Sequence, residues 1–133
     1  MIGTLRLSAA ALLVFLFLTF QATAQCVSPK FLTGAWKAND GGTYYVRRLG
    51  NVVWWVGKSA DNGASWTNVF RGTTDGDTIT GEWADVIHNS GFGTLTLKIL
   101  GKLGTGVHGL EKIGGTGSGF GGQHWFMPCN DTG

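Results

Sequence analysis

Residues 43–57 read TYYVRRLGNVVWWVG, two short runs of β-branched and aromatic residues separated by Leu49 and Gly50. Such runs on either side of a tight turn are typical of a β-hairpin. Successive side chains of a strand point to opposite faces, so Trp54 and Trp55 point to opposite sides of this hairpin. In an all-β chain, one of these two apolar faces meets solvent, a ligand or another subunit.

Outward from this hairpin the same pattern repeats, with short apolar runs between glycines and no sustained helical period. Asp75-Gly76, Gly101-Lys102 and the glycines of 114–117 supply further turns. The pattern predicts eight antiparallel strands at about 33–38, 43–48, 51–57, 66–72, 77–85, 92–100, 104–112 and 119–126. Because closure removes exposed edges, we expect an eight-stranded up-and-down barrel, with an open two-sheet sandwich as the alternative.

The first 24 residues have the three parts of a secretory signal peptide: Arg6, the apolar run 9–20 and Ala22-Thr23-Ala24. The apolar run is too short to span a membrane. We therefore expect residues 1–24 to be removed and residues 25–133 to form one secreted or periplasmic domain. A lipid anchor on Cys26 is the alternative, which Gln25 disfavours because it is not a small residue.

Both cysteines, Cys26 and Cys129, fall in the mature part, and an exported chain meets oxidants, so we expect them to form a disulfide. The formal net charge is only +2, with basic residues scattered apart from Arg47-Arg48. That distribution does not suit a nucleic-acid groove. Arg47-Arg48 is interpreted as a solvated strand edge or a local ion pair.

The octapeptide SADNGASW at 59–66 matches the Asp-box, a turn motif of sialidase propellers that also occurs singly in other β proteins, through Ser59, Asp61, Gly63 and Trp66. The resemblance implies a structural role, in which the aspartate caps backbone amides and the aromatic residue packs under the hairpin. A sialidase propeller needs several blades, and this chain is too short for them.

A second resemblance begins at 33–36, TGAW, which is similar to the opening of avidin-type barrels and of lipocalins, and 80–83, TGEW, is similar to a repeated strand start there. It implies a calycin-like barrel with eight strands. Biotin binding is not implied, because Ala38 stands where avidins have an asparagine. Residues 40–57 and 65–86 also resemble an uncharacterised family of exported bacterial domains.

Tryptophan and tyrosine offer a flat apolar face and a polar edge, which suits sugars and interfaces. The first hypothesis is therefore a non-catalytic domain that binds a small apolar or carbohydrate ligand. Its expected lining is Tyr44, Trp54, Trp66 and Trp83, with Tyr45 and Trp55 as the alternative face. The second hypothesis makes that other face a surface for self-association or for a protein partner.

Catalysis has little support in the sequence. Glu82 and Asp85 stand three apart on one predicted strand, so they face opposite sides and cannot flank one glycosidic bond. A small hydrolase that uses Glu82 as its acid is the third hypothesis. His88, His108 and His124 have no metal-ligand spacing, and no nucleotide motif is present, so we expect neither a metal nor another cofactor.

Overall fold

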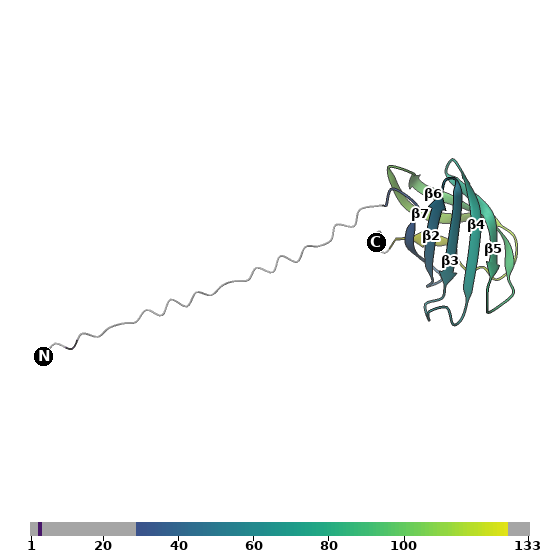
Figure 1. Cartoon of the computed structure of the whole chain (residues 1–133), viewed down its shortest axis with the longest axis horizontal. Helices are drawn as coiled ribbons and strands as arrows, with labels where there is room; N and C mark the ends of the chain where they lie inside the picture. Colours follow the sequence, from purple (N-terminus) through teal and green to yellow (C-terminus); the bar gives the residue numbers. More distant parts are fainter. Residues whose placement is uncertain (1–2, 4–28, 128–133) are drawn as a thin grey trace.

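The computed structural model describes residue 3 and residues 29–127, and the latter form eight antiparallel strands (Figure 1). Each strand pairs with the next one along the chain and the last pairs with the first, which closes the barrel. The strands are β1 (Gly34–Ala38), β2 (Thr43–Leu49), β3 (Val52–Lys58), β4 (Thr67–Asp75), β5 (Thr78–Asp85), β6 (Phe92–Lys102), β7 (Gly106–Gly115) and β8 (His124–Phe126). The prediction of an eight-stranded up-and-down barrel is confirmed.

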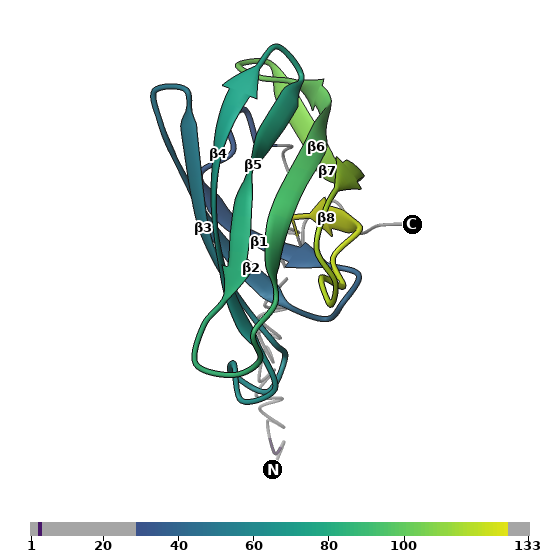
Figure 2. The same cartoon turned by 90° about the vertical axis from the view of Figure 1, so that its right-hand side faces the viewer.

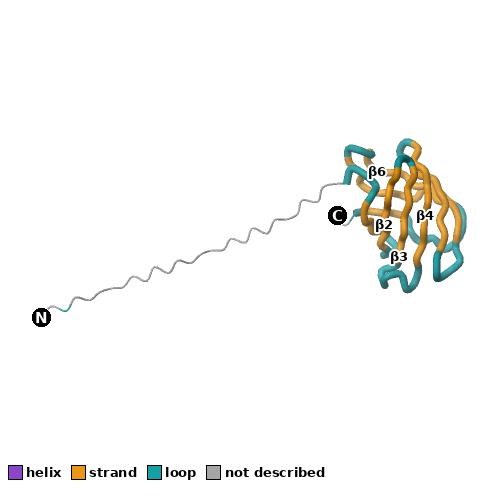
Figure 3. The backbone as a smooth tube through the Cα atoms, in the orientation of Figure 1, coloured by secondary structure: helices purple, strands orange, loops and turns teal. Residues whose placement is uncertain are grey.

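Strands and loops make up this whole part of the chain, as the tube in Figure 3 shows. Accordingly, none of the described residues belongs to a helix that is long and apolar enough to cross a membrane. The expected signal peptide at 1–24 and the expected Cys26–Cys129 disulfide lie outside the described residues, and both stay predictions.

The last strand is shorter than predicted. We expected it at 119–126, but β8 begins at His124. Gly119, the first residue of the expected strand, has a φ of +90°, in the left-handed region, and pairing with β7 begins only at His124, opposite Glu111. Residues 116–123 therefore form a loop. Gly101, expected in a turn, lies instead at the end of β6 next to a register shift.

The two ends of the barrel differ (Figure 2). At one end the connections at 50–51, 76–77 and 103–105 are short, and Gly50 and Gly76 supply φ of +61° and +59°. At the other end, which we call the mouth, four longer loops meet, at 39–42, 59–66, 86–91 and 116–123. An up-and-down barrel gathers alternate connections at one end, so these four loops are neighbours although they are far apart in sequence.

Aromatic rings fill the barrel interior. Trp55 stacks on Phe70 with ring centroids 4.2 Å apart, and it also contacts Tyr44 and Trp125 at 5.4 and 5.5 Å. Small residues make room for these rings, because a Cβ added to the inward-facing Gly57 would lie 2.5 Å from the Tyr44 ring. The barrel is thus packed by large and small residues in contact, and its middle is not a ligand chamber.

The octapeptide 59–66 forms the loop between β3 and β4, so the predicted hairpin is confirmed. The Asp61 carboxylate accepts the Ser65 N–H at 3.1 Å and the hydroxyls of Ser59 and Ser65. These hydrogen bonds, that from Ser59 first, lower the pKa of Asp61 from 3.8 to about 2. Gly63 has a φ of +86°, which a side chain would strain.

Candidate ligand-binding mouth and outer face

The six aromatic residues expected in a site are divided between two surfaces of the barrel. Tyr44 and Trp83 are buried inside, and Trp66 is half-buried at the mouth, where its ring lies 5.8 Å from that of Tyr44. Trp54 does not join them, because its side chain lies on the outer face and is 46% exposed. Tyr45 lies on that outer face as well. Trp55, which was grouped with Tyr45, is instead inside and 3% exposed.

The mouth holds a hollow of about 490 Å³. Its aromatic walls are Trp66, from the loop before β4, and Phe120, from the loop before β8. Trp83 packs beneath Phe120, with ring centroids 4.9 Å apart. The polar lining consists of Asp40, Asn68, Asp85 and Asn89 with serines and glycines of the loops. A few fixed polar groups among aromatic walls are typical of small-molecule sites.

Hydrogen bonds hold each of these polar groups in place. Asp40 accepts the Gly42 N–H at 2.8 Å and the Tyr44 hydroxyl at 2.5 Å. In a separate contact, Asp85 accepts the Gly91 N–H at 3.0 Å. The mouth therefore presents two carboxylates in fixed orientations, and each carboxylate oxygen that accepts one bond has a lone pair left for a ligand.

Two groups beneath the mouth are fixed in the same manner. The Trp55 Nε1–H donates to Asn68 Oδ1 at 2.9 Å, which orients the amide. Burial raises the pKa of Tyr44, and the hydrogen bond to Asp40 and the charge of that carboxylate raise it further, against a smaller opposite effect of Asn68. Tyr44 consequently stays protonated at physiological pH and keeps donating to Asp40.

The charged residues that line the mouth are acidic. Among the described lining residues these are Asp40 and Asp85, while the Lys112 Nζ lies 5.8 Å from the centroid of the Phe120 ring that forms one wall. An anionic ligand would meet two negative charges in the lining, whereas hydroxyl and ammonium groups would find acceptors. The mouth thus favours ligands that donate hydrogen bonds.

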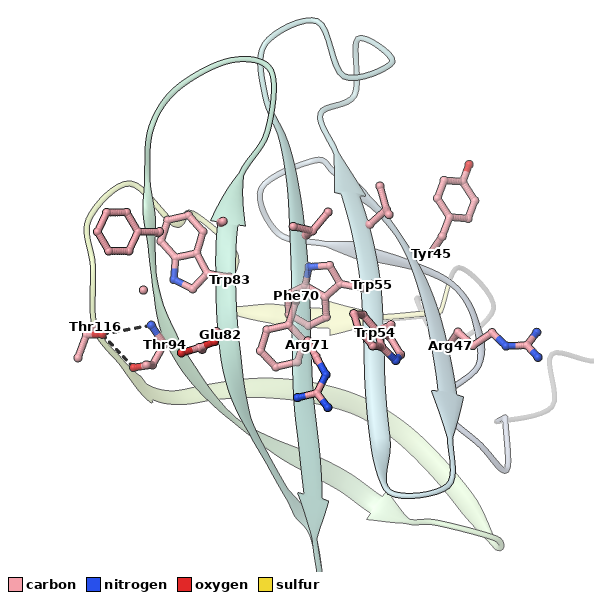
Figure 4. Close-up of a pocket in the computed structure, with 15 residues that line it drawn as sticks. Tyr45, Arg47, Trp54, Trp55, Phe70, Arg71, Glu82, Trp83, Thr94 and Thr116 are labelled. Carbon is pink, nitrogen blue, oxygen red and sulfur yellow. Dashed lines mark hydrogen bonds between the residues drawn. The ribbon is translucent and has the colours of Figure 1, made fainter.

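A second hollow, of about 880 Å³, lies on the outer face of β2 to β6 (Figure 4). The strand register places two rows of outward side chains across it. One row has polar side chains on both sides of one tryptophan, and the other row is apolar apart from the hydroxyl of a tyrosine. The polar row is Arg47, Trp54, Arg71, Glu82 and Thr94, and the apolar row is Tyr45, Val56, Val69, Ala84 and Phe92.

Sequence reasoning missed the polar row as a unit. Arg47 was interpreted as a solvated strand edge or part of an ion pair, and Arg71 was not singled out. The signal was present in the hairpin, because pairing across the turn at Gly50 places Arg47 opposite Trp54. A charged residue opposite Trp54 indicates that the face of Trp54, and not that of Trp55, is the outer one.

Glu82 and Asp85, the two carboxylates considered as an acid and base pair, do not lie at one site. Glu82 lines the outer hollow and Asp85 lines the mouth, so the two carboxylates serve different surfaces. Within these residues, no three histidine, cysteine or acidic side chains are grouped so that they could hold a metal ion.

The function of this chain is inferred here from the geometry of the two hollows. Comparisons with models of protein families, with curated proteins and with solved structures find no match to this chain.

Proposed function

We propose that the protein is a non-catalytic binding protein whose mouth holds a small neutral or cationic ligand rich in hydroxyl or amino groups, such as a sugar or an amino sugar. The observation that carries this proposal is the combination of Trp66 and Phe120 with the two oriented carboxylates in one hollow. A sugar ring presents an apolar face to an aromatic wall and hydroxyls at its edge, which matches that combination.

The packed interior supports the mouth as the place of binding. Trp55, Tyr44 and Trp125 occupy the middle of the barrel in mutual contact, so a ligand that enters the barrel would bind above them. The aromatic cluster then serves as a rigid base, which limits the conformational entropy lost on binding.

Ligand titration tests the proposal. We expect neutral and amino monosaccharides and oligosaccharides, screened by calorimetry, to include a ligand that also changes tryptophan fluorescence. Trp66→Ala should weaken its binding by about 1.5–3 kcal/mol, the range for losing one large buried apolar contact. Trp54→Ala is the matched control, because it removes the same side chain from the other surface.

The result that would overturn the proposal is loss of sugar binding in Trp54→Ala with full binding in Trp66→Ala. Circular dichroism of both variants separates a binding effect from unfolding, since Trp66 also packs against the core. Cleavage of a glycan that depends on Glu82 would favour the hydrolase hypothesis instead.

The place of action is part of the same proposal. We propose that the chain is exported, that residues 1–24 are removed, and that Cys26 and Cys129 pair in the mature domain, as their positions in the sequence suggest. Mass spectrometry of protein from an oxidising compartment should then find an N-terminus at Gln25 and no free thiol. Two titratable thiols in that material would contradict the pairing.

A further inference from the structure

The outer face of β2 to β4 presents a tryptophan between two guanidinium groups. In the register, Trp54 stands opposite Arg47 on β2 and opposite Arg71 on β4. The Arg71 guanidinium carbon lies 5.3 Å from the centroid of the Trp54 ring. Figure 4 shows the three side chains next to one another on the same face. We infer that this face is a second binding site, separate from the mouth, for an anionic polysaccharide that carries carboxylated sugar rings.

The arginines of this face are not neutralised by ion pairs among the described residues. No described carboxylate makes an ion pair or hydrogen bond with Arg47 or Arg71, although Glu82 pairs with Arg71 in the strand register. Lys58 adds a third cation, with its Nζ 5.5 Å from the centroid of the Tyr45 ring. Against these three cations stand Glu82 and the exposed Asp75 at the end of β4, so the face keeps an excess of positive charge.

These side chains suit a ring that has both an apolar face and a carboxylate. A guanidinium group forms two parallel hydrogen bonds with a carboxylate, and it is less strongly hydrated than an ammonium group. An indole face receives the apolar face of a pyranose ring. A uronic acid combines both features in one ring, with its carboxylate at the edge, so one sugar can contact Trp54 and an arginine together.

The outer face is long enough for several sugar rings. The polar row crosses five neighbouring strands from Arg47 on β2 to Thr94 on β6, with Trp54, Arg71 and Glu82 between them. With strands about 4.8 Å apart, four spacings give about 19 Å. That length accommodates several sugar rings in line, which favours a polymer over a single sugar.

The same features argue against other occupants. A peptide that adds a strand needs a free sheet edge, and the closed barrel offers none on this face. A second copy bound symmetrically through this face would bring the arginines of both copies together, with only Glu82 and Asp75 of each copy to offset them. Charge complementarity therefore selects an anionic partner.

Affinity electrophoresis and calorimetry with polygalacturonate test the inference, with dextran as the neutral polymer and dextran sulfate as the sulfated one. We expect binding to polygalacturonate, none to dextran, and weakening when NaCl is raised from about 50 to about 300 mM, because exposed charges are screened. Trp54→Ala should weaken binding about tenfold or more, the effect of losing one stacking contact. Arg47→Gln and Arg71→Gln should each reduce both the affinity and its salt dependence.

Lys98→Gln is the matched control, because Lys98 is an exposed cation on β6 outside both rows. It should leave the affinity within about twofold of the unaltered protein, as expected for a charge that makes no contact. Trp66→Ala should bind the polymer normally, which separates this site from the mouth. Because Trp54, Arg47 and Arg71 are exposed, their variants should stay folded.

Four results would overturn the inference. If Lys98→Gln and Arg47→Gln lowered the affinity for polygalacturonate equally, the net charge of the protein alone would attract the polymer. If the protein bound dextran sulfate but not polygalacturonate, the ligand would not be a polymer of carboxylated sugar rings. Binding of oligothymidylate in place of either polymer would point to single-stranded nucleic acid. A change of mass in sedimentation on Trp54→Ala, without polymer binding in the unaltered protein, would assign the face to a second copy.

Discussion

Trp54 and Trp55 are adjacent in the chain, but the two faces of β3 on which they lie are built by different rules. On the inner face, Trp55 stacks on Phe70 and donates to Asn68, with Gly57 beside it to leave space. On the outer face, Trp54 stands between Arg47 and Arg71. The neighbours across the ladder, and not the residue type, thus distinguish the tryptophan that packs inside from the one that is exposed.

The sharpest test of this comparison is Trp55→Ala. We expect it to lower the free energy of unfolding by about 3–5 kcal/mol, because it leaves a large cavity in the aromatic cluster. It also leaves Asn68 Oδ1 without its donor. Urea denaturation measures the loss. A loss below about 1 kcal/mol is closer to the size expected at an exposed site. It would contradict the difference in packing between the two faces of β3.

A smaller loss is expected from Gly57→Ala, which adds one carbon to the inner face. That carbon would lie 2.5 Å from the Tyr44 ring, so we expect a loss of about 1–3 kcal/mol from overpacking. Gly114→Ala on β7 is the control, since its added carbon would find Thr96 at an ordinary 3.8 Å. Thermal melting of both variants should separate them, and equal melting temperatures would contradict tight packing around Tyr44.

The loop that contains Asp61 joins β3 to β4. The contribution of Asp61 to the free energy of unfolding depends on pH. The folded-state pKa is lowered to about 2 from 3.8, so the stabilisation is complete above about pH 4 and is lost as the pH falls towards 2. Asp61→Asn should therefore be less stable than the unaltered protein at pH 6, with the difference shrinking between pH 4 and 2. A difference that stays constant over that interval would show that the charge of Asp61 is not involved.

The smallest effect on stability is expected for Trp54→Ala, which alters only the outer face. Trp54 is 46% exposed, so we expect a change of no more than about 0.5 kcal/mol in the free energy of unfolding. Urea denaturation beside Trp55→Ala provides the comparison. A loss as large as that of Trp55→Ala would show that the outer indole is part of the packing.

The positions of the strands could be predicted from the sequence, because turns and apolar runs are local signals. Seven of the eight strands lie within a few residues of their predicted positions, and the meander follows from the short connections between them. The last strand was predicted too long, because neither the left-handed conformation of Gly119 nor the start of pairing at His124 is visible in an apolar pattern.

The sites were harder to predict, because alternation along one strand separates its two faces without saying which is inside. That decision depends on the register of neighbouring strands, which sets Arg47 and Arg71 beside Trp54. The mouth depends on loops that meet only when the barrel closes, so Asp40 and Phe120 could not be joined from the sequence.

The shortness of β8 has a kinetic consequence. This strand is held by two registered pairs to β1 and two to β7, whereas β3 and β4 share seven. Local opening starts where the fewest contacts must break, so amide hydrogens along this seam should exchange first. Because Trp125 lies on β8 and is fully buried, the same opening admits water to the aromatic centre. β8 is therefore the strand at which we expect the barrel to open locally.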